Sequence, residues 1–163
     1  MKYNMKILMV CLGNICRSPL AEGILKDKIK AKGLDWEVDS AGTSGWHKGE
    51  RPDPRSIKVG LLHNTDIRNQ RSRKLLPEDL QKFDLIFAMD SSNYQKIIAL
   101  ANSEEERNKV NLIMNMVNPG MNEKVPDPYL NDDGFENVYN MLDRACDAIV
   151  ERYVQKGQKK ISL

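Results

Sequence analysis

The side chains of this sequence best placed to do chemistry together are a cysteine and an arginine. They are Cys11 and Arg17, in the run Cys11-Leu12-Gly13-Asn14-Ile15-Cys16-Arg17-Ser18. The planar guanidinium of an arginine can bind two oxygens of one phosphate, which a lysine ammonium cannot do. A thiolate is the nucleophilic form of cysteine, and a nearby arginine favours it. The spacing therefore predicts a site that binds a phosphate ester and attacks it with sulfur.

This run lies between a predicted strand and a predicted helix. Residues Ile7–Val10 form a short apolar stretch, and Ser18-Pro19 opens a helical pattern. A loop that leads into a helix N-terminus points several backbone N–H groups at one place, where the helix dipole also attracts an anion. Gly13 permits close approach of the backbone, and Asn14 tolerates the left-handed conformation that tight loops use. We therefore expect a phosphate-binding loop made of Leu12, Gly13, Asn14, Ile15, Cys16, Arg17 and Ser18.

Strands and helices alternate along the chain. The first helix should end at Gly33, and we predict further strands at 36–41, 85–89 and 110–114 and further helices at 53–63, 77–82, 93–101 and from 135 onwards. The last helix carries a regular apolar face, with Cys146 on its apolar side. This order predicts a single α/β domain over residues 1–163, with its core at about 5–154 and a frayed tail from 156. The sheet should be four-stranded and mostly parallel, with helices on both faces and the ligand site at the carboxyl ends of its strands.

Composition excludes several classes of protein. A formal net charge of +2 and a pI near 8.4 are too mild for a nucleic-acid-binding domain, and the apolar runs are too short for a signal peptide or a membrane span. Three irregularly spaced cysteines form neither a disulfide framework nor a zinc pair. We therefore expect a cytoplasmic protein with no metal or other cofactor, no nucleic-acid partner and no membrane insertion. The few aromatic residues give no argument for a dimer, so we expect a monomer.

The run from Val10 to Pro19, with Ala21-Glu22 behind it, closely resembles the signature of the low-molecular-weight protein-tyrosine phosphatases. The segments Asp39 to Trp46, Ala88-Met89-Asp90 and Asp127-Pro128-Tyr129 extend this resemblance over most of residues 5–154. The resemblance implies hydrolysis of aryl phosphate esters, either phosphotyrosine in proteins or small aryl phosphates. It also implies a cysteinyl-phosphate intermediate on the cysteine of the loop, with the arginine of the loop as phosphate clamp.

The resemblance further implies roles for residues outside the loop. Asp127 would protonate the leaving phenolate and later activate water, as general acid and base. Ser40 would support the phosphate loop, and Trp46 and Tyr129 would form walls of the substrate pocket. Within the loop, Ser18 would stabilise the thiolate as it leaves.

Three positions leave questions open. Cys16 is either a buried filler or a redox partner that traps oxidised Cys11 as a disulfide, and the resemblance favours the redox role. Leu130 stands where many members of the family have a second aromatic residue. Gln70 stands where members often have a supporting histidine.

Other functions fit parts of the same pattern. An arsenate reductase of similar fold would need further cysteines between Cys16 and Cys146, where this chain has none. Protein-arginine phosphatases typically carry threonine at the position of Ile15. A phosphate-recognition module would bind without turnover and would not need Asp127. Eight basic residues against three acidic ones between Lys48 and Lys74 form either a rim for acidic phosphopeptides or an ordinary solvated face.

Overall fold

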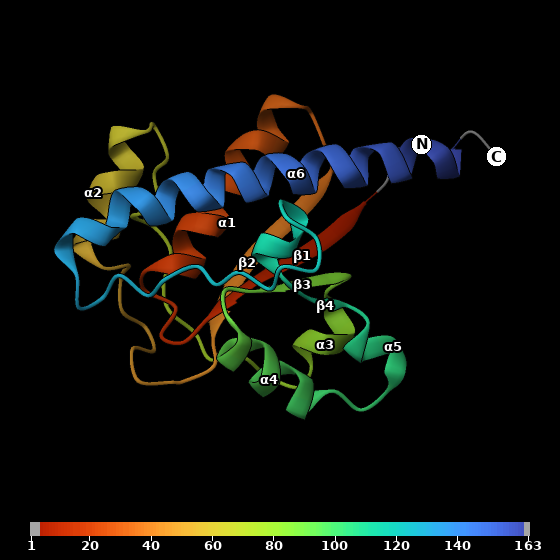
Figure 1. Ribbon diagram of the computed structural model, residues 1–163, viewed down its shortest axis with the longest axis horizontal. Helices are drawn as coiled ribbons and strands as arrows, with labels where there is room; N and C mark the ends of the chain where they lie inside the picture. Colours follow the sequence, from red (N-terminus) through yellow and green to blue (C-terminus); the bar gives the residue numbers. More distant parts are fainter. Residues whose placement is uncertain (1–3, 162–163) are drawn as a thin grey trace.

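Four parallel strands form the centre of the structure, a computed structural model that describes residues 4–161 (Figure 1). The strands lie in the order β2-β1-β3-β4. Strand β1 is central, and at its carboxyl end Cys11 pairs with Gly42 of β2 while Val10 pairs with Ala88 of β3. Every pairing is parallel, which confirms the predicted fold class. The bounds are Met5–Cys11 for β1, Trp36–Gly42 for β2, Leu85–Ala88 for β3 and Val110–Leu112 for β4.

Helices cover both faces of this sheet (Figure 1). Side chains of β1 alternate between two cores: Ile7 and Met9 pack in a cluster with residues of α1, α2 and α6, and Leu8 and Val10 pack in a cluster with residues of α3 and α4. Helix α5 lies on the same side of the sheet as α3 and α4 in Figure 1. The bounds are Arg17–Ala31 for α1, Pro54–Leu62 for α2, Asp79–Lys82 for α3, Ser91–Leu100 for α4, Glu104–Arg107 for α5 and Phe135–Ile161 for α6.

Caps define where the helices begin and end. Helix α1 stops just before Gly33, whose φ of 63° is the left-handed conformation that glycine adopts without strain. The carboxylate of Asp53 accepts a hydrogen bond from the N–H of Arg55 and begins α2, and Asp90 caps α4 in the same way through Asn93. Both caps place a carboxylate near the carboxyl edge of the sheet, beside the first loop.

Some predicted bounds were wrong. Strand β4 ends at Leu112, and a 3-10 helix, η1, follows over Ile113–Met116, because Ile113 and Met114 turn into the core cluster beneath α6. Helix α6 continues to Ile161 through the stretch predicted to fray, since lysine and glutamine are good helix formers. Residues 162 and 163 of that predicted tail lie outside the described residues. Helix α5 and a second 3-10 helix, η2 (Asp132–Gly134), were not predicted.

Candidate active site

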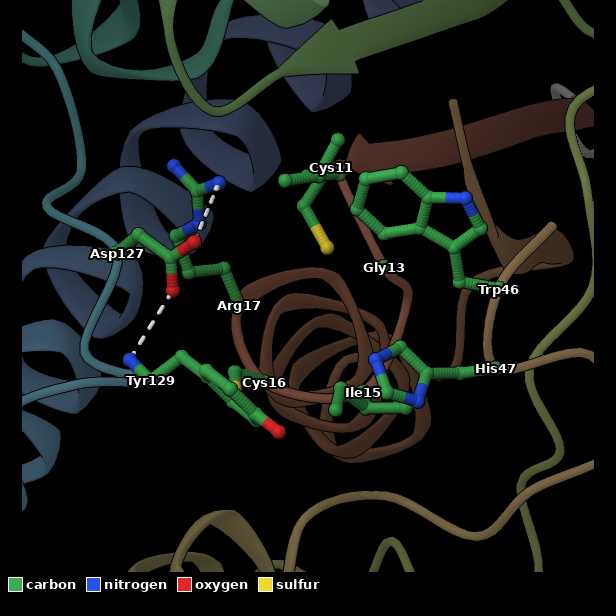
Figure 2. A pocket seen from close by; sticks show the side chains of 10 residues that line it. Cys11, Gly13, Ile15, Cys16, Arg17, Trp46, His47, Asp127 and Tyr129 are labelled. Carbon is green, nitrogen blue, oxygen red and sulfur yellow. Dashed lines mark hydrogen bonds and ion pairs between the residues drawn. The ribbon is translucent and has the colours of Figure 1, made fainter. Parts of the chain in front are cut away.

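A pocket opens at the carboxyl edge of the sheet, where β1 passes into α1 (Figure 2). The nucleophile, the arginine and the distant aspartate predicted from sequence all contribute to its wall. Trp46 and His47 stand on one side of the opening, and Asp127 and Tyr129 stand on the other. The lining residues are Cys11, Leu12, Gly13, Ile15, Cys16, Arg17, Trp46, His47, Asp127 and Tyr129.

The sulfur of Cys11 lies at the base of the loop with two hydrogen-bonding neighbours. Its Sγ is 3.0 Å from the Ser18 hydroxyl oxygen, and the backbone N–H of Asn14 donates to it over 3.3 Å. The side chain is almost entirely buried. A hydroxyl and an amide directed at sulfur stabilise a thiolate, so the geometry suits a nucleophile that also has to leave again.

Asn14 holds the loop in its coiled shape. Its φ is 57°, in the left-handed region that asparagine tolerates. Its side-chain amide donates to the hydroxyls of Ser18 (2.8 Å) and Ser40 (2.9 Å), and its carbonyl oxygen accepts from the N–H of Arg73 (3.0 Å). Ser40 in turn donates to Glu22 over 2.6 Å. This buried network joins the loop to β2 and α1, so Ser40 lies where a loop-supporting residue would be needed.

Arg17 is fixed by groups from distant parts of the chain. Its Nη1 donates to Asp90 Oδ2 over 2.7 Å and to the carbonyl oxygen of Val125 over 2.9 Å, while its Nη2 lies 3.7 Å from Asp127 Oδ2. Burial by itself would lower the pKa of Arg17, but the neighbouring Cys11 and the hydrogen bond to Asp90 outweigh it and raise that pKa. The guanidinium therefore stays charged at the wall of the pocket.

The second side of the pocket is far more exposed than the loop. The Asp127 side chain is 45% exposed, and one of its oxygens accepts from the N–H of Tyr129 over 3.1 Å. Trp46 is 81% exposed, so it is a free-standing wall and not part of the core. The ring of His47 lies 6.3 Å from that of Tyr129, and its Nδ1 pairs with Glu50. An aromatic ring could enter between these side chains.

The other two cysteines have different surroundings. Cys16 lines the pocket, and burial, with a contribution from Asp53, raises the pKa of its thiol. Burial likewise raises the pKa of Cys146, a residue of α6 whose side chain lies in the core as predicted. All three cysteines are free thiols in this structure. The raised pKa values of Cys16 and Cys146 favour their thiol forms at neutral pH, so neither is the expected nucleophile toward a phosphate ester.

Several residues that contact the site were given no role by the sequence. Asp90 orients Arg17, Glu22 anchors Ser40, and His47 lines the pocket. Asp90 directly follows a predicted strand, so its position at the carboxyl edge of a parallel sheet was the signal that could have found it. Gln70 does not reach the loop network: its amide donates to the carbonyl oxygen of Pro19 in the first turn of α1, over 3.0 Å.

The basic stretch from Lys48 to Lys74 is in part structural. Three of its arginines form ion pairs with aspartates: Arg55 pairs with Asp53 and Asp132, Arg68 pairs with Asp66, and Arg73 pairs with Asp39 and Asp79.

Among residues 4–161, no cluster of His, Cys, Asp and Glu side chains is arranged to hold a metal ion. No helix in the same range is both long and apolar enough to cross a membrane.

Comparisons with known proteins identify the family of this chain. Residues 6–160 match the family model described as low molecular weight phosphotyrosine protein phosphatase. A low molecular weight phosphotyrosine protein phosphatase of Schizosaccharomyces pombe is 42% identical over 146 residues, which cover 87% of this chain and 92% of the relative. Among solved structures, a protein tyrosine phosphatase of Entamoeba histolytica with Hepes in the active site superposes with a TM-score of 0.87 at 35% identity, covering 93% of this chain and 98% of the other.

One further solved structure bears on the alternatives raised by the sequence. It is a Drosophila protein described as an arginine phosphatase, with a TM-score of 0.85 and 34% identity, covering 91% of this chain and 98% of the other. The fold alone therefore does not choose between phosphorylated amino acids. The matched family model and the relatives nevertheless cover nearly the whole chain, and this chain belongs to the low molecular weight phosphotyrosine protein phosphatase family of enzymes.

Proposed function

We propose that this protein hydrolyses phosphotyrosine esters in proteins, and small aryl phosphates, with Cys11 as nucleophile, Arg17 as phosphate clamp and Asp127 as general acid and base. The observation that carries this proposal is the meeting of these three side chains on one pocket, although the aspartate is far away in the sequence. The relative from Schizosaccharomyces pombe, described as a phosphotyrosine protein phosphatase and aligned over 87% of this chain at 42% identity, supports the same reaction.

In the first step, the thiolate of Cys11 attacks phosphorus in line with the bond to the phenol oxygen. The sulfur–phosphorus bond forms as the phosphorus–oxygen bond breaks, and Asp127 donates its proton to the departing oxygen. The loop amides and the guanidinium of Arg17 hold the remaining phosphate oxygens as charge shifts among them. Asp90 and the Val125 carbonyl keep that guanidinium in place.

In the second step, water replaces sulfur. Asp127, now a carboxylate, takes a proton from the water as its oxygen attacks phosphorus, and the sulfur–phosphorus bond breaks. The leaving thiolate is received by the Ser18 hydroxyl and the Asn14 amide, which already lie within hydrogen-bond distance of the sulfur. Phosphate leaves, and the starting state of Cys11 is restored.

The walls of the pocket favour an aryl ester over phosphoarginine. Trp46 and Tyr129 offer aromatic faces on opposite sides of the opening, and Ile15 contributes only methyl and methylene groups to the lining. An isoleucine has no hydroxyl with which to bind a guanidinium. Phosphoarginine is the competing substrate to test, because a structural relative is described as an arginine phosphatase.

No step of this route needs a metal or other cofactor, because the guanidinium and the loop amides supply the positive field. Three free, buried cysteines suit a reducing compartment, and we place the enzyme in the cytoplasm as a monomer.

Cys16 keeps a proposed redox role. If a peroxide oxidised Cys11 to its sulfenic acid, condensation with the Cys16 thiol would form a disulfide and release water, and a thiol reductant would reverse it.

The first test is phosphate release from a phosphotyrosine peptide in the presence of a metal chelator, by the unmodified protein and by Cys11→Ser. We expect turnover by the unmodified protein and only background release by the variant, which should still bind the peptide. A phosphoarginine peptide serves as the competing substrate. If neither protein releases phosphate from the phosphotyrosine peptide but both still bind it, the result would instead support a recognition module.

A further inference from the structure

Arg55, in the first turn of α2, reaches across to the segment that carries Asp127. Its Nη2 donates to the carbonyl oxygen of Tyr129 over 2.9 Å, and its Nη1 donates to Asp132 Oδ1 over 2.5 Å. Its guanidinium also lies 5.7 Å from the centre of the Tyr129 ring and 4.6 Å from that of Phe135. One side chain thus contacts this segment at its backbone, at a carboxylate and at one ring, and also contacts the Phe135 ring at the start of α6.

The same arginine is anchored to the phosphate loop. Its Nε and Nη2 donate to the two oxygens of Asp53, over 3.0 and 2.8 Å, which is the paired geometry that arginine makes with a carboxylate. Asp53 is buried, and its backbone N–H donates to the carbonyl oxygen of Ile15 over 2.8 Å. A short chain of contacts therefore runs from Ile15 in the phosphate loop, through Asp53 and Arg55, to Tyr129.

Few side-chain hydrogen bonds reach the segment that receives these contacts. Among the described residues, Arg55 is the only side chain outside residues 126–134 that donates hydrogen bonds into that segment. A hydrogen bond within the segment runs from the Tyr129 N–H to Asp127. Arg17 faces Asp127 only at 3.7 Å, as an ion pair. The position of the Asp127 carboxyl thus depends on a segment whose hydrogen bonds from outside side chains come from Arg55.

We infer that Arg55 is a positioning residue, which holds the backbone at Tyr129 so that the Asp127 carboxyl faces the leaving-group side of the pocket. This inference rests on the proposed function of Asp127 as general acid. Arg55 does not itself line the pocket, and the lining residue that it contacts through its side chain is Tyr129, on the same side as Asp127. Its effect on the reaction should therefore be largest where proton donation matters.

The chain contains a matched control in Arg68. Its backbone N–H and its Nε both donate to Asp66 Oδ1 over 3.0 Å, and its Nη2 donates to Asp66 Oδ2 over 2.9 Å. This repeats the pairing of Arg55 with Asp53, two positions apart in each case. The side chain of Arg68, however, makes no hydrogen bond, ion pair or ring contact with residues 126–134, all of which the structure describes. Replacing Arg68 removes the same kind of local pair without releasing the Asp127 segment.

The experiment compares Arg55→Ala and Arg68→Ala on aryl phosphates whose leaving phenols range from acidic nitrophenols to unsubstituted phenol. An acidic phenol leaves as its anion without help, whereas phenol and tyrosine need the proton. For Arg55→Ala we expect kcat/KM to fall by roughly 30-fold on phenyl phosphate and phosphotyrosine, and by less than about threefold on para-nitrophenyl phosphate. For Arg68→Ala we expect all substrates to stay within about twofold of the unmodified enzyme.

A double-variant cycle shows whether Arg55 acts through Asp127. In an Asp127→Ala background, Arg55→Ala should change kcat/KM by less than about twofold, because the acid that it positions is gone. Independent, multiplying losses in the double variant would overturn the inference, and so would an equal loss on every substrate or no loss at all. If Arg55→Ala does not fold, Arg55→Lys applies the same test, since a lysine cannot pair with Asp53 and bind the Tyr129 carbonyl in one plane. An unmodified enzyme that is inactive on all these esters would refute the proposed function instead.

Discussion

The two sides of the pocket are built in opposite ways. In the phosphate loop, Asn14, Arg17 and Ser18 are at most 3% exposed, and their polar groups are paired with buried or partly buried partners. In the segment that carries Asp127, Leu130 is 94% exposed and Asp132 is 84% exposed. The proposed phosphate-binding loop is thus preorganised in the folded chain, whereas the proposed proton donor lies on a surface segment with few side-chain anchors. A substrate ring can enter and leave on the second side without disturbing the first.

Asn14→Ala is the change that should most impair the phosphate-loop side of the pocket, which we call the rigid side. Alanine is strained at a φ of 57° and removes both donors and the acceptor of the asparagine side chain. We expect kcat/KM for para-nitrophenyl phosphate to fall about 100-fold, and the free energy of unfolding measured with urea to drop by about 3 kcal/mol.

Asn14→Gly separates the two causes. Glycine accepts the left-handed backbone but makes no side-chain hydrogen bonds, so it should be about 1 kcal/mol more stable than the alanine variant and still poorly active. If both variants matched the unmodified protein in kcat/KM and stability, the contrast between a preorganised phosphate loop and a weakly anchored Asp127 segment would be wrong.

Asp90→Asn tests the same side by a smaller change. Asparagine can still cap α4 through the Asn93 N–H, so the helix should remain. The guanidinium of Arg17 would lose its closest carboxylate, at 2.7 Å, and with it part of its fixed orientation. We expect roughly a tenfold lower kcat/KM and a similar rise in the inhibition constant of inorganic phosphate. A lower kcat/KM with unchanged phosphate inhibition would mean that Asp90 does not act through Arg17.

Leu130→Ala should have the smallest effect of all. Its side chain projects into solvent, although it lies only three positions after Asp127. We expect kcat/KM for a phosphotyrosine peptide to stay within about twofold and stability within about 0.5 kcal/mol. A tenfold loss would show that the exposed side is as tightly specified as the phosphate loop, or that Leu130 contacts the peptide.

The rigid side of the pocket was also the more predictable one. A strand, a Pro-opened helix and the residues between them are local signals, and β1, α1 and the left-handed Asn14 follow from them. The partners of Arg17 and the anchor of Tyr129 come from remote segments, and no spacing in the sequence pairs Arg55 with Tyr129. Only the family resemblance pointed to Asp127. A short apolar run also does not show where a strand ends. The predicted fourth strand therefore extended to residue 114, whereas the structure has a 3-10 helix from Ile113 onwards.

The hydrogen bond from Arg17 to the Val125 carbonyl joins residues 108 positions apart. A ribosome therefore releases Cys11 and Arg17, the proposed nucleophile and clamp, early in synthesis, while Val125 and the proposed acid, Asp127, emerge late. During translation the nascent chain would carry Cys11 before the aspartate that is proposed to complete its catalytic cycle. Closing such a long chain loop is entropically slow, so enzymatic competence should appear among the last events of folding. Activity regained during refolding would thus report the docking of the final third of the chain, and not the formation of the central strand.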